Sequence, residues 1–386
     1  MERRERAMEG MGLNNPLKST RAVFPLNQQD MLHSIVKDDM DYIGKKFTKA
    51  HLFSGQTILI TGGGGFIGFY LVLSLLNMRK KGVEVKQINI LDRFPRGVPQ
   101  WLQDLEAEGW PVKAIQFDVT QDSFTPHTQD AEYIFHMASI ASPTYYRKFP
   151  LDTLEANVFG LKRLLDSCLP FTPKGILFFS SSEVYGNPNS EFVPTPESYN
   201  GNVATVGPRA CYDESKRFGE TLCSLYHSEH NLPIRIVRPF NNFGPGLELN
   251  DRRVASDFAK AIKEQSDIEV LSDGKPTRTY CYIADAIIGY LLVMTHHRFD
   301  IFNIGSDADE INVTDLAHLF MDCALQLTGK RPEITYSNSA DPHYLTDNPE
   351  RRCPNIDKAR KELDFNPEIS LEEGIRRYLV SCGVGL

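Results

Sequence analysis

Residues 57–68 read TILITGGGGFIG, and this stretch decides the fold. A short apolar and β-branched run is followed at once by glycines with the spacing GxxGxxG, at Gly62, Gly65 and Gly68, and then by a helix-length apolar segment. Glycine permits a tight turn and lets backbone N–H groups approach an anion, while the following helix directs the positive end of its dipole to the same point. The pattern predicts a strand, a phosphate-binding loop and a helix, in preference to a glycine-rich turn without a ligand.

A carboxylate at the end of the next expected strand supports a dinucleotide site. Asp92 lies 24 residues after Gly68, near the interval at which an acidic residue binds ribose hydroxyls. Its charge would repel a 2′-phosphate, so we expect NAD as the cofactor, although the adjacent Arg93 could hold such a phosphate. Asp118, at the end of the third expected strand, is placed to meet the adenine, and its alternative role is to cap a helix or turn.

Apolar runs of strand length alternate with amphipathic helix-length segments from residue 56 onward. The expected strands are Thr57–Thr61, Val85–Leu91, Val112–Phe117, Tyr133–His136, Gly175–Ser180 and Ile234–Val237. The expected helices are Phe66–Lys81, Pro150–Cys168, Pro208–His230 and Leu371–Val380. This alternation predicts an α/β fold of the Rossmann type, a doubly wound parallel sheet covered by helices on both faces.

The rhythm divides the chain into three parts. We expect residues 55–240 to form the NAD-binding domain. Residues 241–386 are expected to form mainly a smaller mixed α/β lobe that binds substrate, with some segments returning to the first domain. Residues 1–54 form an appendage, and the helical spacing of its apolar residues predicts one amphipathic helix that docks on the main domain. These residues are Leu32, Ile35, Val36, Met40 and Ile43.

The composition is that of a soluble protein with a sizeable core. Lys and Arg number 42 against 50 Asp and Glu, and the net charge of −8 argues against nucleic acid or an anionic membrane as the main partner. No apolar run approaches the roughly 20 residues that span a bilayer, and the charged N-terminus lacks a signal core. The seven cysteines form no CxxC pair, so we expect reduced thiols, no metal site and a cytoplasmic location.

Two further segments carry groups able to transfer protons. The apolar strand that ends near residue 180 runs into SSSEVYG, residues 180–186. The later segment CYDESK places Tyr212 and Lys216 four residues apart, on one face of an expected helix. A nearby ammonium lowers the pKa of a phenol, so this pair can take a proton from a sugar hydroxyl while hydride leaves for NAD. The alternative is a solvated Tyr–Lys pair on a helix surface.

The motifs TGGGGFIG, HMASIASP, SSSEVYG, YDESK and RPFNNFGPG, in this order, resemble those of the extended short-chain dehydrogenases/reductases that act on nucleotide sugars. The resemblance covers about residues 55–380. It implies that NAD oxidises the sugar C4 hydroxyl, with Tyr212, Lys216 and the hydroxyl of Ser181 at that centre. It also implies a UDP-sugar substrate and a homodimer joined by the helices near residues 150–168 and 208–230.

Within that group, the pair Ser182-Glu183 resembles the UDP-glucuronate decarboxylases (UDP-xylose synthases). A 4,6-dehydratase carries Asp where this chain has Ser182, and a 4-epimerase needs no carboxylate at position 183. The segments GNVATVGPRACYDESKR, NDRRVASDF, TRTYCYIAD and NPERRCPNI point the same way. The resemblance implies that Arg352 holds the sugar carboxylate and that Glu183 lies near C5. UDP-glucuronate would then lose CO₂ through a 4-keto intermediate, giving UDP-xylose and regenerating NAD.

The same resemblance assigns the remaining contacts of both ligands. For the cofactor it implies contacts from Gly62, Gly65, Phe66, Ile67, Gly68, Asp92, Asp118, Val119, Ala138 and Lys216. For the substrate it implies Arg352, Arg253, Arg278, Asn241, Tyr146 and Asn157. Arg253 and Arg278 are expected to meet the UDP phosphates, and for each the alternative is a surface ion pair.

Several positions depart from the decarboxylase pattern. Ser181 replaces the usual threonine and keeps its hydroxyl, Arg252 replaces a glycine, and the segment after Asp92 does not match. These departures allow a relative that acts on a different hexuronate or nucleotide. The nearest competing hypotheses are a nucleotide-sugar 4-epimerase or 4,6-dehydratase. A non-catalytic NAD-binding sensor is a hypothesis of another class, and it would have no need of Tyr212, Lys216 and Ser181 together.

Overall fold

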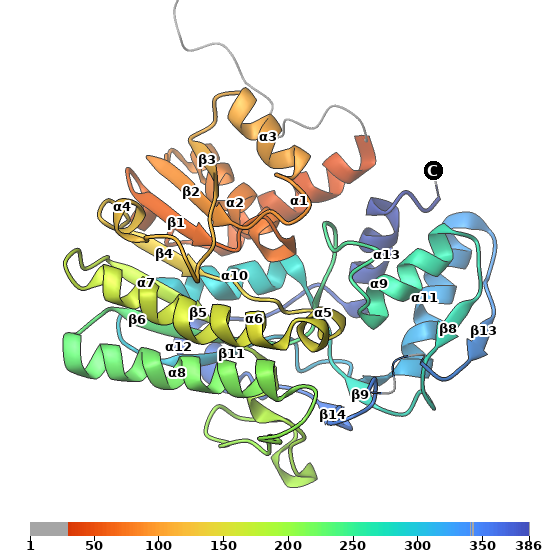
Figure 1. The fold of residues 1–386 in the computed structure, drawn as a ribbon. Coiled ribbons are helices and arrows are strands. Elements are labelled where there is room, and N and C mark those ends of the chain that lie inside the picture. Colours follow the sequence, from red (N-terminus) through yellow and green to blue (C-terminus); the bar gives the residue numbers. More distant parts are fainter. Residues whose placement is uncertain (1–29, 340, 342, 386) are drawn as a thin grey trace, which may run out of the picture.

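The computed structural model describes residues 30–339, 341 and 343–385, and its centre is a seven-stranded parallel sheet (Figure 1). The strands lie in the order β11-β6-β5-β4-β1-β2-β3. Their bounds are β1 Thr57–Thr61, β2 Gln87–Asp92, β3 Val112–Gln116, β4 Tyr133–His136, β5 Gly175–Phe179, β6 Ile234–Pro239 and β11 Ile301–Ile304. The order reverses between β1 and β4, the switch point beside which doubly wound sheets bind ligands. The predicted fold class is confirmed.

Alternate residues of the strands supply two separate cores, because successive side chains of a strand point to opposite faces of the sheet. Ile58 and Ile60 belong to the core under one set of helices, and Leu59 between them belongs to the core under the other set. The first set is α1 Asp30–Lys46, α2 Phe66–Asn77, α3 Gln100–Ala107, α10 Ile283–Met294 and α12 Asp357–Leu363. The second set is α4 Thr125–Thr128, α7 Leu161–Cys168 and α8 Ala210–His230. Both faces of the sheet are thus buried.

Short helical segments complete this part of the chain. They are α5 Pro143–Lys148, α6 Pro150–Glu155, a π-helix η3 at Ala156–Gly160, and the 3₁₀ helices η1 Ala50–Phe53, η2 Met78–Lys81, η4 Ser182–Tyr185 and η5 Ser190–Phe192. The π-helix joins α6 to α7, so the helix predicted over 150–168 is present with one wider turn inside it.

The smaller lobe is built from the residues after β6, and it lies to one side of the sheet (Figure 1). Its helices are α9 Val254–Lys263, α11 Val313–Thr328 and α13 Leu371–Ser381. Its short strands are β7 Asn242–Phe243, β8 Ile268–Val270, β9 Thr277–Arg278, β10 Cys281–Tyr282, β12 Ile311–Asn312, β13 Ile334–Tyr336 and β14 Arg351–Arg352. In the three-stranded sheet β12-β9-β14, Arg352 lies opposite Arg278.

Helix α1 is packed into the main core. Its apolar residues Val36, Met40 and Ile43 are buried at the predicted helical spacing, whereas the side chain of Leu32 lies outside the described residues. Asp39, fully buried, accepts hydrogen bonds from the hydroxyls of Tyr70 (2.8 Å) and Tyr282 (2.6 Å). It also accepts one from Nη1 of Arg377 at 2.6 Å. One carboxylate therefore ties α1 to α2, β10 and α13.

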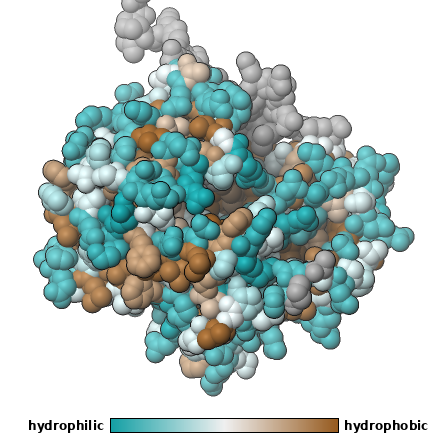
Figure 2. Space-filling model, in the orientation of Figure 1, coloured by the Kyte–Doolittle hydropathy of each residue, from teal (hydrophilic) through white to brown (hydrophobic). Residues whose placement is uncertain are grey.

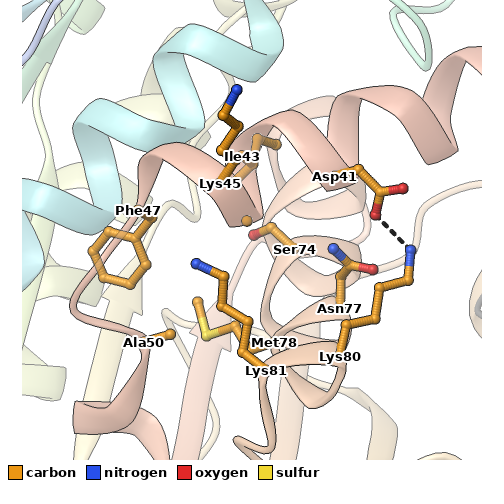
Figure 3. Close-up of a pocket in the computed structure, with 11 residues that line it drawn as sticks. Asp41, Ile43, Lys45, Phe47, Ala50, Ser74, Asn77, Met78, Lys80 and Lys81 are labelled. Atoms are coloured by element: carbon orange, nitrogen blue, oxygen red, sulfur yellow. Dashed lines mark hydrogen bonds and ion pairs between the residues drawn. The ribbon is translucent and has the colours of Figure 1, made fainter.

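A cavity of about 340 Å³ lies where α1 meets α2 and η2 (Figure 3). It is lined by Asp41, Ile43, Gly44, Lys45, Phe47, Ala50, Ser74, Asn77, Met78, Lys80 and Lys81. The ion pair between Asp41 and Lys80 closes one side of it. None of the predicted site residues lines this cavity, so it is separate from the chemistry considered below.

Candidate active site

The glycine loop forms a cradle that only glycine permits. Gly62 has φ +70°, and a Cβ atom there would lie 2.7 Å from the backbone of Ala138, at the end of the neighbouring strand β4. A Cβ atom on Gly68 would overlap the backbone of Gly63. The loop therefore packs backbone against backbone, and α2 begins at Phe66 directly behind it. This arrangement fits the pyrophosphate of a dinucleotide, which is held by N–H groups and a helix N-terminus.

Asp92 ends β2 beside this loop. One of its carboxylate oxygens accepts a hydrogen bond from the Gly64 N–H at 3.0 Å, and the other accepts one from the Phe94 N–H at 2.9 Å. Each oxygen keeps a free lone pair, which ribose hydroxyls could use. The guanidinium of Arg93 points to Asp118, 4.0 Å away. The donor set therefore fits NAD.

Asp118 serves as a local cap in this structure. Its Oδ1 accepts hydrogen bonds from the N–H (2.9 Å) and the hydroxyl (2.7 Å) of Thr120. Although burial opposes ionisation, these bonds and the charge of Arg93 lower the pKa of Asp118. The capping alternative is thus realised, while a contact with adenine stays a prediction. The neighbouring Val119 packs against Gly160 of the π-helix.

Tyr212, Lys216 and Ser181 come together where β5 ends against α8. Nζ of Lys216 donates to the carbonyl of Phe179 at 2.8 Å and lies 5.8 Å from the centre of the Tyr212 ring. Burial lowers the pKa of Lys216 to about 7. Burial also raises the pKa of Tyr212 to about 12, and a hydrogen bond with the Ser181 hydroxyl offsets part of that rise. Tyr212 and Lys216 are thus buried side by side with the half-buried Ser181, whereas the lowering of the Tyr212 pKa expected from the lysine is outweighed by burial.

Glu183 lies at the centre of a buried charge cluster. Both Nη atoms of Arg352 donate to its two carboxylate oxygens, and the Nη2–Oε2 distance is 2.7 Å. Nη2 of Arg209 donates to the same carboxylate from the other side. Nε of Arg209 lies 3.6 Å from the carboxylate of Asp213. We call these four residues the carboxylate–arginine cluster, and it pairs two cations with two anions.

Three members of the cluster are shielded from water, and the side chain of the fourth, Glu183, is 17% exposed. Arg209 and Arg352 are each 5% exposed and Asp213 is 4% exposed. Burial alone would raise the pKa of Glu183, but the two guanidinium groups outweigh it and hold that pKa well below its usual range. Burial and the negative charge of Glu183 raise the pKa of Asp213. Glu183 is therefore the firmly ionised member of the pair.

Comparisons with known proteins identify the family of the chain. Residues 58–305 match the family described as the NAD dependent epimerase/dehydratase family. The chain belongs to that family. It is also 34% identical over 324 residues to UDP-glucuronic acid decarboxylase 6 of Arabidopsis thaliana, which covers 83% of this chain and 87% of that protein. It is 33% identical over 328 residues to UDP-glucuronic acid decarboxylase 1 of Xenopus tropicalis, with 84% and 71% covered.

Solved structures show the same fold. UDP-glucuronic acid 4-epimerase from Bacillus cereus, in complex with UDP-glucuronic acid and NAD, has a TM-score of 0.70 at 23% identity. The match covers 85% of this chain and 99% of that one. MoeE5 in complex with UDP-glucuronic acid and NAD has a TM-score of 0.69 at 21% identity, and covers 86% and 100%. As a member of the epimerase/dehydratase family, this protein uses NAD.

Three substrate-binding residues predicted for this family member lie around the cluster. Arg278 is bonded through Nη2 to the carbonyl of Pro349 (2.7 Å) and through Nη1 to that of Thr277 (2.7 Å). Nε of Arg253 is paired with the carboxylate of Asp251 at 2.8 Å, which is the ion pair given as its alternative role, and its charge also lowers the pKa of Tyr212. Asn241 has φ +28° and donates to the carbonyl of Thr279 at 2.9 Å. Contacts of these residues with a nucleotide stay predictions.

Two more predicted residues support α8 from the side. Tyr146 is 1% exposed and stacks on Tyr212, with ring centres 5.0 Å apart and planes at 14°. Asn157, within the π-helix, donates through Nδ2 to the Ser215 hydroxyl at 2.8 Å. Ser182, the first residue of η4, is also buried. These side chains fix the position of the helix that carries Tyr212.

Arg209 and Asp213 were not among the residues predicted from the sequence. Their signal was present in PRACYDESK, because Arg209, Tyr212, Asp213 and Lys216 follow one another at helical spacing. No metal centre was predicted either. Among the described residues, His296, Asp300 and Glu362 come within reach of one ion. Both carboxylates there are already ion-paired, with Lys358 and Arg298, and this group lies outside the site.

Proposed function

We propose that this protein decarboxylates UDP-glucuronate to UDP-xylose and regenerates NAD. The observation that carries the proposal is Arg352. Its buried guanidinium already holds the carboxylate of Glu183 with two parallel hydrogen bonds. The same cluster contains Asp213, which is the neighbour of Tyr212 in the sequence. A planar fork of this kind recognises a carboxylate, which a uronate carries and a neutral hexose lacks. The curated decarboxylases that resemble the chain support the same substrate.

The chain's own residues fit the required proton transfers. NAD, when bound, accepts the hydride of sugar C4 and returns it at the end of the cycle. Tyr212 takes the proton of the C4 hydroxyl, and Ser181 hydrogen-bonds the oxygen on which negative charge develops as CO₂ leaves. Lys216 lies beside the tyrosine and supplies positive charge there when it is protonated, below its pKa of about 7. The backbone N–H of Glu183 donates to the Ser181 hydroxyl at 3.2 Å, and this position next to Ser181 supports a role for the Glu183 carboxylate in the proton transfer at C5.

The proposal is tested by incubating the purified protein with UDP-glucuronate and NAD and following the products by NMR. Release of CO₂ and appearance of a UDP-pentose are expected. UDP-galacturonate without CO₂ would instead identify a 4-epimerase, which is the activity named for one structural neighbour. A 4-keto-6-deoxy sugar from a nucleotide hexose would identify a dehydratase. Absence of any turnover by folded protein that binds NAD would support the sensor hypothesis.

We further propose that the protein is a cytoplasmic homodimer. Helices α6 and α8 and the π-helix carry large apolar side chains on the outside, and Figure 2 shows hydrophobic surface on this side of the molecule. Leu151 is 74%, Phe159 54%, Phe218 49% and Leu225 52% exposed. Pairing these helices across two copies would bury that surface. Light scattering should give twice the mass of the chain, and Phe159→Glu should halve the measured mass.

The seven free cysteines support a reducing compartment, which favours the cytoplasm.

A further inference from the structure

Arg352 is already occupied by a carboxylate of the protein itself. Glu183 presents two oxygens to its guanidinium, with one Nη–O distance of 2.7 Å, in the geometry that the carboxylate of a uronate would need. The edge formed by Nη1 and Nη2 of Arg352 cannot hold both carboxylates in this planar, two-bond manner, and Nη2 also donates to the carbonyl of Gly186 at 3.4 Å. A sugar acid that uses Arg352 must therefore displace Glu183.

Glu183 is also bound by a second cation, Arg209. Arg209 donates to the same carboxylate, and its Nε lies 3.6 Å from the carboxylate of Asp213, one turn further along α8, at ion-pair distance without a hydrogen bond. The guanidinium of Arg209 lies over the ring of Tyr146, with 5.9 Å between Cζ and the ring centre. Arg209 is thus fixed by α8 and α5, whereas Arg352 belongs to the short strand β14 of the smaller lobe. The two arginines approach Glu183 from different parts of the molecule.

We propose that Glu183 stands in for the substrate's carboxylate on Arg352, and that Arg209, a positioning residue backed by Asp213, retains Glu183 when the uronate takes its place. The inference rests on the proposed function, because it takes the substrate to be a nucleotide uronate. The exchange replaces one charged pair by another, so Arg352 is never left as an unpaired buried charge, which would be costly. A neutral hexose offers no carboxylate for this exchange, and the cluster thereby selects against it.

The exchange also changes the pKa of Glu183 when the substrate binds. Two guanidinium groups hold the pKa of Glu183 low while both are bound to it. When Arg352 turns to the substrate, Glu183 keeps Arg209 alone, so its affinity for a proton rises. The groups whose charges face it are Arg209, Arg352, Arg278, Asp213, Tyr212 and Tyr146. Arrival of the uronate would thus prepare Glu183 for the proton transfer at C5.

Ligand binding tests the exchange without turnover. Dissociation constants of UDP-glucuronate and UDP are measured by calorimetry, with NAD present, in protein that carries Tyr212→Phe so that turnover is slow compared with the measurement. UDP lacks the sugar acid and serves as the control ligand. With Glu183→Gln added, the competitor loses its charge, and UDP-glucuronate should bind about tenfold more tightly, because an uncharged amide competes less strongly for the guanidinium of Arg352 than a carboxylate does. Binding of UDP should not change.

A second substitution should act in the opposite direction. Arg209→Met leaves Glu183 with Arg352 as its only partner in the cluster, so UDP-glucuronate should bind at least several-fold more weakly while UDP is unaffected. Arg209→Lys should restore part of the loss. A purely structural role for Arg209 would weaken both ligands together, and that result would overturn the proposal. Unchanged or weaker binding of UDP-glucuronate to the Glu183→Gln protein would overturn it as well.

The two proposals fail separately. Wild-type protein that binds UDP-glucuronate but releases no CO₂ refutes the decarboxylase function, and the binding constants still decide the exchange. Wild-type protein that releases CO₂ while both variants bind UDP-glucuronate like their parent supports the function and refutes the exchange. If Glu183→Gln does not fold, the paired Arg209→Met and Arg209→Lys measurements decide alone.

Discussion

Replacing Asp39 by alanine should strongly destabilise the protein, although Asp39 lies outside both the active site and the matched family region. The carboxylate is fully buried and accepts three hydrogen bonds, from Tyr70, Tyr282 and Arg377. Its loss leaves two phenol hydroxyls without their acceptor, and each unsatisfied buried polar group costs about 1–3 kcal/mol. Arg377 still donates to the carboxylate of Glu373 at 2.7 Å, so its positive charge retains one ion-pair partner. We expect a total cost of about 3–5 kcal/mol, in the range for breaking a buried ion pair.

The assay is urea unfolding followed by circular dichroism, with Asp38→Ala as the matched control. Asp38 is the preceding residue of the same helix and is exposed, so its replacement should change the free energy of unfolding by less than about 0.5 kcal/mol. Asp39→Asn keeps one acceptor oxygen and should fall between the two. If Asp39→Ala and Asp38→Ala unfold at the same urea concentration, then α1 is not tied to the domain in the way the contacts indicate.

Three further outcomes are expected. Tyr212→Phe should lower kcat by roughly 10²–10⁴-fold with little change in Tm, since only the proton acceptor is lost; a decrease of less than tenfold would exclude Tyr212 as the base. Lys216→Met should abolish most activity. Burial lowers the pKa of Lys216 from 10.5 to about 7, so between those pH values the unfolded chain binds one more proton than the folded chain. The stability of the wild type relative to the variant should therefore rise with pH in this range, by at most ~1.4 kcal/mol per pH unit, as measured in paired thermal melts. Arg252→Gly should leave Tm unchanged or slightly raised in the same melts, because Arg252 has φ +69°, a left-handed conformation that glycine adopts without strain; a clear loss of stability would contradict this.

The sheet and the cofactor loop could be predicted from the sequence because their signals are local. The apolar run at residues 57–61 and the glycines behind it specify a strand, a turn and a helix within twelve residues. Strand β11, at Ile301–Ile304, was not predicted, since four residues within a region of short mixed elements carry no distinctive period. Its place beside β6 is decided by long-range packing, and α10 before it crosses back over the sheet.

The pairing of charges in the site could not be predicted in the same way. Glu183 and Arg352 are 169 positions apart, and their contact depends on how β14 of the smaller lobe meets the end of β5. The resemblance to the decarboxylases implied that both residues face the sugar. It did not indicate that they would bind each other, because a motif specifies residue types and not the partner that each one takes before substrate arrives.

Helix α8 carries a sequence signal for the site that lies outside the known motifs. Arg209 immediately precedes this helix, and Tyr212, Asp213 and Lys216 follow at i+3, i+4 and i+7, the spacing that normally marks the apolar stripe of a helix facing the core. Here that stripe is polar, and all four residues are buried. Burying charged groups costs folding free energy unless partners compensate for it, so a charged stripe at core spacing indicates a function that outweighs the cost. Such a stripe implies that its partners come from elsewhere in the fold, and Glu183 and Arg352 are those partners here.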